Sequence, residues 1–185
     1  MSAPKPSPSR QPAPSSPRAP LEQPMVRHGL AFAVAIVVPA LLRILMPMPS
    51  PGTSLISFLL IVLGFGLMLV GVALYGWWEY VQLAHRDAEE WDHWRLGRGP
   101  AGFTRHPSWF GVMLFTLGQS LIGTTVWLLA WAVLVVVGLN LLVVRHDEPQ
   151  LARTYGAEYE DYQARVSRWL PWQFLMQLIG VKRPH

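Results

Sequence analysis

Two short polar segments, each at the border of a long apolar stretch, carry the residue types in this chain that could do chemistry. In the first, Arg105 and His106 stand directly before Pro107. In the second, Asp147 and Glu148 stand directly before another proline. If a helix begins at Pro107, the first segment offers a guanidinium, an imidazole and free backbone N–H groups, which suit a carboxylate or another anion. The carboxylates of the second segment suit hydroxyl groups, an ammonium or a sulfonium. Together the two segments predict a site for a charged cofactor.

The composition indicates the setting in which these segments must be brought together. Hydrophobic residues make up 51% of the 185 residues and charged residues 14%, which is too apolar for an ordinary soluble domain. The apolar residues are gathered into four runs, at residues 29–45, 55–77, 108–122 and 126–144. We therefore predict an all-α, polytopic integral membrane protein with about four transmembrane helices.

A helical hairpin is predicted from the third and fourth runs, because only residues 123–125 separate them. Gly123 is expected to close the first helix and a threonine to cap the second. Counted from this turn, His106 is about 17 residues away, or roughly 26 Å of helix, and Asp147 about 22, or roughly 33 Å. Both lengths are close to the ~30 Å thickness of the hydrocarbon core, so the two polar segments should be neighbours at one membrane face, with the cofactor pocket between them. Pro149 is expected to push the residue before it out of the helical region and so to end the fourth helix.

The distribution of basic residues predicts the orientation. The two short turns between spans carry none of the fifteen, and Arg43 is the only basic residue that the following orientation misplaces. By the positive-inside rule, both termini and the polar loop at 79–104 lie in the cytoplasm, and the membrane is an inner or plasma membrane. All eleven acidic residues fall on the same side. Charges that merely flank spans, without chemistry, are an alternative that the pattern leaves open.

The ends of the chain and its composition limit other interpretations. Residues 1–24, rich in proline and serine, predict a disordered tail, which leaves 25–185 as one membrane domain with its core at 97–171. Residues 172–181 predict an amphipathic helix in the membrane interface. The absence of cysteine excludes disulfides, thiolate nucleophiles and cysteine-based metal sites. Because the basic residues are interleaved with acidic ones, nucleic-acid binding has little support.

A metal site on the polar loop is a weaker alternative. His85, Glu89 and His93 would share one face of a helix, at spacings of four residues. Two histidines are few for a membrane di-iron enzyme, and a solvated helix with paired charges is the commoner outcome for such a pattern. We therefore expect no metal.

The polar segments also carry a family resemblance. Residues 105–111 resemble the R-H-P-x-[Tyr/Trp]-x-G signature of the isoprenylcysteine carboxyl methyltransferase family and its phospholipid methyltransferase relatives. Residues 147–171 are similar to that family's E-E…G-x-E-Y-x-x-Y…R-V-P…P tail, and 97–100 to the glycine-containing stretch before its R-H-P. The resemblance implies a membrane methyltransferase that uses S-adenosylmethionine. The cofactor-binding residues that it implies are Gly97, Gly99, Arg105, His106, Pro107, Trp109, Gly111, Asp147 and Glu148.

The resemblance also implies a lipophilic acceptor, such as a prenylated cysteine. Its carboxylate has a pKa of roughly 3.5 and is already ionised, so methyl transfer would need alignment rather than a general base. We assign Arg165 or Arg168 to orienting that carboxylate, with arginines that face lipid headgroups as the alternative. Glycines and apolar side chains between spans would leave a lateral opening for the lipid tail.

Three other functions stay open. A phospholipid amine or a small thiol could be the acceptor within the same superfamily. Sterol reductases have a similar C-terminal pattern and use a nicotinamide cofactor, although Ser108 and Val112 depart from it. A membrane adaptor without enzymatic activity would bind no cofactor.

Overall fold

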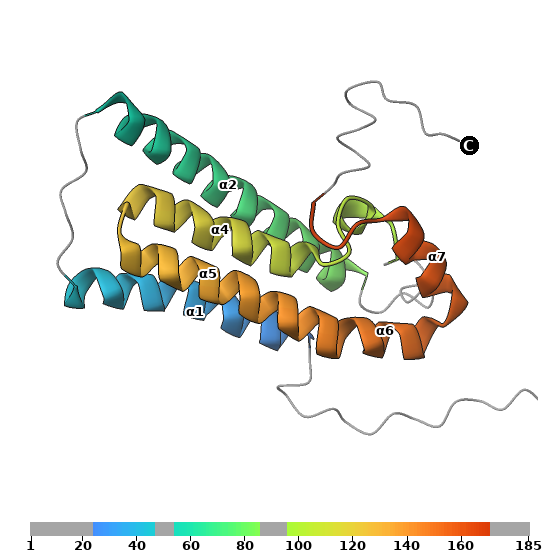
Figure 1. Cartoon of the computed structure of the whole chain (residues 1–185). Coiled ribbons are helices and arrows are strands. Elements are labelled where there is room, and N and C mark those ends of the chain that lie inside the picture. The colour runs from blue at the N-terminus through green and yellow to red at the C-terminus, as the bar shows by residue number, and fades with distance from the viewer. Residues whose placement is uncertain (1–23, 47–53, 86–95, 171–185) are drawn as a thin grey trace, which may run out of the picture.

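The chain is a bundle of helices in the computed structural model, which describes residues 24–46, 54–85 and 96–170 (Figure 1). The described ranges contain helices and turns and no strand, which confirms the predicted all-α class. The elements are α1 (Pro24–Leu45), α2 (Leu55–Ala84), the 3₁₀-helix η2 (Gly99–Gly102), α4 (Pro107–Gly123), α5 (Val126–Leu142), the π-helix η3 (Val143–Asp147), α6 (Glu148–Tyr155) and α7 (Ala157–Arg165).

Three stretches are long and apolar enough to cross a membrane: Met25–Leu45, Leu55–Ala84 and Val126–Tyr155. Large apolar side chains such as Leu59 and Leu134 are exposed on their outer faces, as expected of helices that face lipid. The protein is therefore an integral membrane protein. The predicted third span forms α4, whose 17 residues span about 26 Å and are short for a full crossing.

Helix α4 lies at the centre of the bundle, in contact with α1, α2 and α5. Its closest neighbour is α2, and glycines on both helices set the distance between the two backbones. A Cβ added to Gly111 would lie 2.7 Å from the carbonyl oxygen of Gly71, and one added to Gly64 would lie 2.7 Å from that of Gly118. Small residues thus let two helix backbones touch. Gly66, on the same helix as Gly64 and Gly71, faces open space.

The predicted end of the fourth span at Pro149 is wrong. Glu148 keeps helical angles (φ −64°, ψ −44°), and the helix continues through the proline to Tyr155. The chain widens into the π-helix just before the proline, where the N–H of Glu148 donates to the carbonyl of Val143, five residues back. A local π turn relieves the clash that a proline ring makes in a regular α-helix.

Two smaller boundaries also differ from expectation. Thr124, and not Gly123, takes the left-handed conformation that ends α4 (φ 45°, ψ 30°), and Thr125 makes no side-chain cap. Glu79 lies inside α2, because the amphiphilic stretch that follows the apolar run continues the helix to Ala84.

Several predictions fall outside the described residues. These are the tail at 1–24 except for its last residue, the interfacial helix at 172–181, and both Glu89 and His93. The described C-terminal part, α6 and α7, lies at the end of the bundle where α4 begins (Figure 1).

Candidate functional site

The two polar segments meet, as the hairpin geometry predicted. The guanidinium of Arg105 lies 2.8 Å from Oε1 of Glu148. The indole N–H of Trp109 donates to Oδ2 of Asp147 at 2.8 Å. The predicted proximity of the two polar segments is confirmed, whereas the cofactor pocket predicted between these segments stays a prediction.

The start of α4 shapes one side of this junction. Pro107 occupies the first turn of α4, where a missing backbone N–H breaks no helical hydrogen bond. His106 precedes it with non-helical backbone angles (φ −131°, ψ 68°). The side chain of His106 makes no capping hydrogen bond to the helix. The positive end of the helix dipole therefore points at the junction, where the carboxylates of Glu79, Asp147 and Glu148 lie against Ser108, Trp109 and His106.

Glu148 is the centre of a buried ionic cluster. Arg168 binds it with two hydrogen bonds, from Nε at 2.9 Å and from Nη2 at 2.6 Å. Arg105 binds the same carboxylate, and Nε2 of His106 lies 3.6 Å from Oε1, too far for a hydrogen bond. Two guanidinium groups against one carboxylate leave a surplus positive charge, so the cluster suits a further anion.

Three buried polar atoms beside Glu148 have no hydrogen-bond partner among the described residues. They are Nε of Arg105, Nε2 of His106 and the hydroxyl of Tyr159. An unsatisfied buried polar group costs about 1–3 kcal/mol, so three in one place are expected where a ligand supplies the missing partners. Burial lowers the pKa of His106 and raises that of Tyr159. At neutral pH the imidazole is therefore uncharged and the phenol keeps its proton.

Asp147 anchors a second cluster on the other side of the junction. Nη2 of Arg27 lies 2.9 Å from its Oδ1, and the guanidinium sits 5.5 Å above the ring of Trp109. His146 lies 3.2 Å from the same oxygen. Sequence reasoning missed Arg27, because a basic residue at the start of an apolar run is read as an orientation signal.

A third polar group, also missed, links α1, α2 and α4. Nδ1 of His28 lies 2.9 Å from Oε1 of Glu79, and the hydroxyl of Ser108 donates to the same oxygen at 3.1 Å. The ring of His28, which is 7% exposed, packs edge-on against Trp109 at 4.5 Å. Sequence reasoning missed this group because it assigned residues 79–104 to a polar loop, which placed Glu79 outside the bundle.

The two arginines predicted to orient the acceptor occupy different places. Arg168 lies at the junction, bound to Glu148 as described above. Arg165 is exposed on α7, and its Nε donates to the carbonyl of Asp161 one turn back. The role of either arginine toward an acceptor stays a prediction.

The predicted glycines have backbone roles. Gly97 (φ 89°) and Gly99 (φ 56°) take left-handed conformations in the turn before α4, which L side chains rarely adopt. The hydroxyl of Tyr162 donates to the carbonyl of Ala101 in the same turn at 2.8 Å. Gly111 faces α2 and not the junction.

A strap at residues 166–170 holds the junction from outside. The N–H of Arg105 donates to the carbonyl of Ser167 at 3.1 Å, and the hydroxyl of Thr104 to that of Arg168 at 2.7 Å. The indole of Trp169 then donates to Asn140 on α5 at 3.0 Å. The C-terminal motif is therefore attached to the loop before α4 and to α5.

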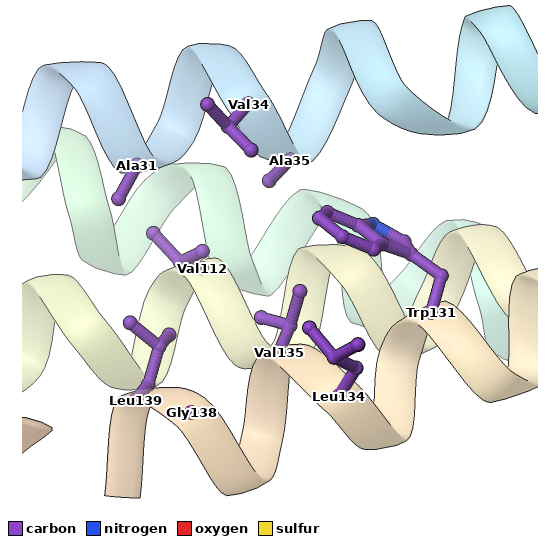
Figure 2. Close-up of a pocket in the computed structure, with 9 residues that line it drawn as sticks. All are labelled: Ala31, Val34, Ala35, Val112, Trp131, Leu134, Val135, Gly138 and Leu139. Atoms are coloured by element: carbon purple, nitrogen blue, oxygen red, sulfur yellow. The ribbon is translucent and has the colours of Figure 1, made fainter. Parts of the chain in front are cut away.

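An apolar cavity of about 160 Å³ lies between α1, α4 and α5 (Figure 2). The residues that line it are Ala31, Val34, Ala35, Val112, Trp131, Leu134, Val135, Gly138 and Leu139.

The metal alternative remains untested. His85 bonds through Nδ1 to the carbonyl of Val81 at the end of α2, at 3.0 Å, while Glu89 and His93 lie outside the described residues. Within the described ranges, no group of three or more side chains is arranged to hold a metal ion.

Comparison with known protein families finds a match over most of the chain. A protein-family model described as "Protein of unknown function (DUF1295)" matches residues 30–166, which is more than half of the chain. No curated protein matches, and no solved structure does.

Proposed function

Because the chain belongs to the DUF1295 family, a family of membrane proteins similar to steroid reductases and methyltransferases, we propose that it is a membrane methyltransferase. In this proposal it uses S-adenosylmethionine and acts on a lipophilic acceptor. The family is not specific to isoprenylcysteine carboxyl methyltransferases, so the proposal rests on the site. The observation that carries it is the set of three unpartnered buried polar atoms around Glu148.

The residues of the Glu148 cluster fit the polar parts of this cofactor. Arg105 and the start of α4 suit its carboxylate, because both present positive charge and Nε of Arg105 is a donor without a partner among the described residues. Glu148 and the hydroxyl of Tyr159 suit its ammonium or ribose hydroxyls. When bound, S-adenosylmethionine supplies an electrophilic methyl group on a sulfonium.

The chain's own part in the reaction is binding and exclusion of water. His106, Glu148 and Tyr159 are all buried, so groups held among them lose most of their hydration. His106 stays uncharged at neutral pH because burial lowers its pKa, so it does not repel a cationic sulfonium nearby. The distribution of basic residues, by the positive-inside rule, supports placing the junction and both termini on the cytoplasmic side.

A nicotinamide-dependent reductase is the second candidate. The similarity of the family to steroid reductases favours it, and the surplus positive charge at Arg105 and Arg168 suits a nucleotide phosphate as well as a carboxylate.

Calorimetric titration of the detergent-solubilised full chain with S-adenosylmethionine and, separately, with NADPH tests the proposal. We expect binding of S-adenosylmethionine and a loss of about ten- to a hundredfold in affinity in Arg105→Gln, since a hydrogen bond to a charged group is removed. Arg153→Gln, an exposed arginine on α6, is the matched control and should bind as the unmodified chain does. Binding of NADPH alone would replace this proposal with the reductase, and binding of neither would remove both.

A further inference from the structure

The indole N–H of Trp131 is a buried hydrogen-bond donor that neither ionic cluster uses. Trp131 lines the apolar cavity between α1, α4 and α5, and its Nε1 has no hydrogen-bond partner among the described residues. We propose that this cavity binds an apolar alcohol from the bilayer. Its hydroxyl oxygen accepts a hydrogen bond from Nε1 of Trp131, and its O–H donates one to the carbonyl oxygen of Ala35. The site is separate from the proposed reaction and does not depend on it.

The buried setting of this N–H is unusual for a membrane tryptophan. Trp131 belongs to Val126–Tyr155, a stretch long and apolar enough to cross a membrane, and tryptophans near the ends of such spans usually place the polar edge of the ring at the headgroups. Nε1 of Trp131 is covered by protein instead, whereas Trp127, one turn earlier on α5, is 50% exposed. A donor buried without a partner is costly inside a membrane, so a bound molecule is expected to supply the partner.

A carbonyl that lines the same cavity supplies the matching acceptor. Pro39 lies inside α1 and has no backbone N–H, so the carbonyl of Ala35, four residues earlier, has no α-helical donor. Ala35 is 1% exposed, and Figure 2 shows the side chain of Trp131 extending from α5 toward α1, beside Ala35. Gln119, whose Oε1 is also buried without a partner, does not line the cavity. One donor and one acceptor together suit a hydroxyl group, which both accepts and donates.

The rest of the cavity suits a carbon skeleton. Its other lining side chains are apolar, and its volume of about 160 Å³ is close to the roughly 150 Å³ of a dry cavity that holds a six-carbon ring. A single water molecule would satisfy the same two groups but would leave most of this space empty. Val34 and Leu134, which line the cavity, are 41% and 62% exposed, so a molecule can enter from the bilayer between α1 and α5. An apolar alcohol therefore fits better than water.

The distance from the junction separates this site from the proposed reaction. From Trp131 to Asp147 the helix runs for about 16 residues, or roughly 24 Å. A hydroxyl held at Trp131 is therefore too far from the junction to receive a methyl group from a cofactor bound there. Because α1 bounds the cavity and also carries Arg27 to Asp147, the bound alcohol is a structural ligand that stabilises the packing of α1 on the hairpin.

Equilibrium dialysis against the detergent-solubilised full chain tests the hydroxyl with three ring compounds of similar shape. Cyclohexanol offers a donor and an acceptor, cyclohexanone an acceptor only, and methylcyclohexane neither. Uptake by protein-free micelles is subtracted for each compound.

Trp131→Phe keeps an aromatic ring in place and removes the N–H. We expect cyclohexanol and cyclohexanone to bind this variant about three- to tenfold more weakly, because one hydrogen bond is lost, and methylcyclohexane to bind as before. Trp127→Phe, at the exposed position on the same helix, is the matched control and should change the binding of none of the three. Equal changes for all three compounds in Trp131→Phe, or no change for any, would overturn the inference.

The acceptor is tested by Pro39→Ala, which supplies an N–H to the carbonyl of Ala35. We expect this variant to bind cyclohexanol about three- to tenfold more weakly and cyclohexanone as before, because a ketone needs only the donor of Trp131. Loss of both compounds alike, or of neither, would remove the carbonyl from the site.

A direct signature comes from the indole proton of Trp131. Its NMR signal, identified by its absence from Trp131→Phe, should move downfield when cyclohexanol is added and stay in place with methylcyclohexane. The signal of the exposed Trp127 reports on the detergent and should move with neither compound. A Trp131 signal that cyclohexanol does not move would overturn the inference and leave water as the partner of the indole.

A cavity variant separates binding in this site from binding elsewhere on the protein. An added Cβ at Gly138, which lines the cavity, meets nothing within 4 Å, so Gly138→Leu can fill the space. Gly66 on α2 is equally open and does not line the cavity, so Gly66→Leu is the matched control. We expect Gly138→Leu to lose cyclohexanol binding at least tenfold and Gly66→Leu to retain it. Equal binding by both variants would exclude the cavity.

Discussion

Arg105 and Glu148 lie 2.8 Å apart at the centre of the protein's ionic cluster, although a complete helical hairpin separates them in the chain. Both side chains are largely buried, at 12% and 11% exposure. Partners at this depth cannot be replaced by water, so removing one leaves the others unpaired.

Glu148→Gln is therefore expected to destabilise the protein. The change leaves Arg105 and Arg168 without their shared anion and should lower the free energy of unfolding by about 2–4 kcal/mol. Thermal unfolding of the detergent-solubilised protein, followed by circular dichroism, measures this. Glu160→Gln, at an exposed position of α7, is the control and should change stability by less than about 0.5 kcal/mol. Equal effects of both changes would contradict the central place of Glu148.

Two neighbouring tyrosines should respond to loss of the hydroxyl with opposite signs. The hydroxyl of Tyr159 is buried without a partner among the described residues, whereas that of Tyr162 donates to Ala101. Tyr159→Phe should leave stability unchanged or raise it, and should weaken cofactor binding, because in the proposed function the hydroxyl binds the cofactor. Tyr162→Phe should lower stability by about 1 kcal/mol and leave cofactor affinity unchanged in the folded protein. Unfolding and calorimetry on both variants give the comparison, and a loss of stability in Tyr159→Phe would mean that its hydroxyl is already satisfied.

Gly111 should be intolerant of any side chain. A methyl group there would meet the backbone of Gly71 on α2, which cannot move without separating the helices. Gly111→Ala is expected to lower stability by about 1–3 kcal/mol. At Gly66 the same change meets open space and should be neutral or stabilising by up to about 1 kcal/mol. If unfolding experiments find the two variants alike, α2 and α4 do not pack through these glycines.

The protein should lose stability toward acid pH through His106. Burial lowers its pKa in the folded protein, while the unfolded chain titrates near a pKa of about 6.5. The unfolded state therefore binds more protons in this range, and the contribution of His106 is complete above about pH 6.5 and lost as the pH falls through the lowered pKa. Unfolding midpoints measured between pH 5 and pH 8 should fall more steeply for the unmodified protein than for His106→Gln. Parallel profiles would show that the imidazole titrates normally.

The sequence by itself determined the membrane setting and the meeting of two polar segments. Long apolar runs can only be placed in lipid, and a turn of three residues makes the flanking helices antiparallel, so the positions of Arg105 and Glu148 followed from helix rise alone. The breaking effect of Pro149 was predicted wrongly, because a local rule for α-helices does not foresee that a π turn absorbs the proline.

Only the tertiary structure decided which side chains complete the two clusters. Arg27, His28 and Glu79 come from helices outside the recognisable motif, and their rotation about the helix axes follows from how α1 and α2 pack on α4. The same packing separates two adjacent carboxylates, with Asp147 directed to Arg27 and Glu148 to Arg105. Spacing along the chain determines how far along the helix axis a residue lies. The direction in which its side chain points depends on how the helices pack, here through close contact of the backbones at glycines.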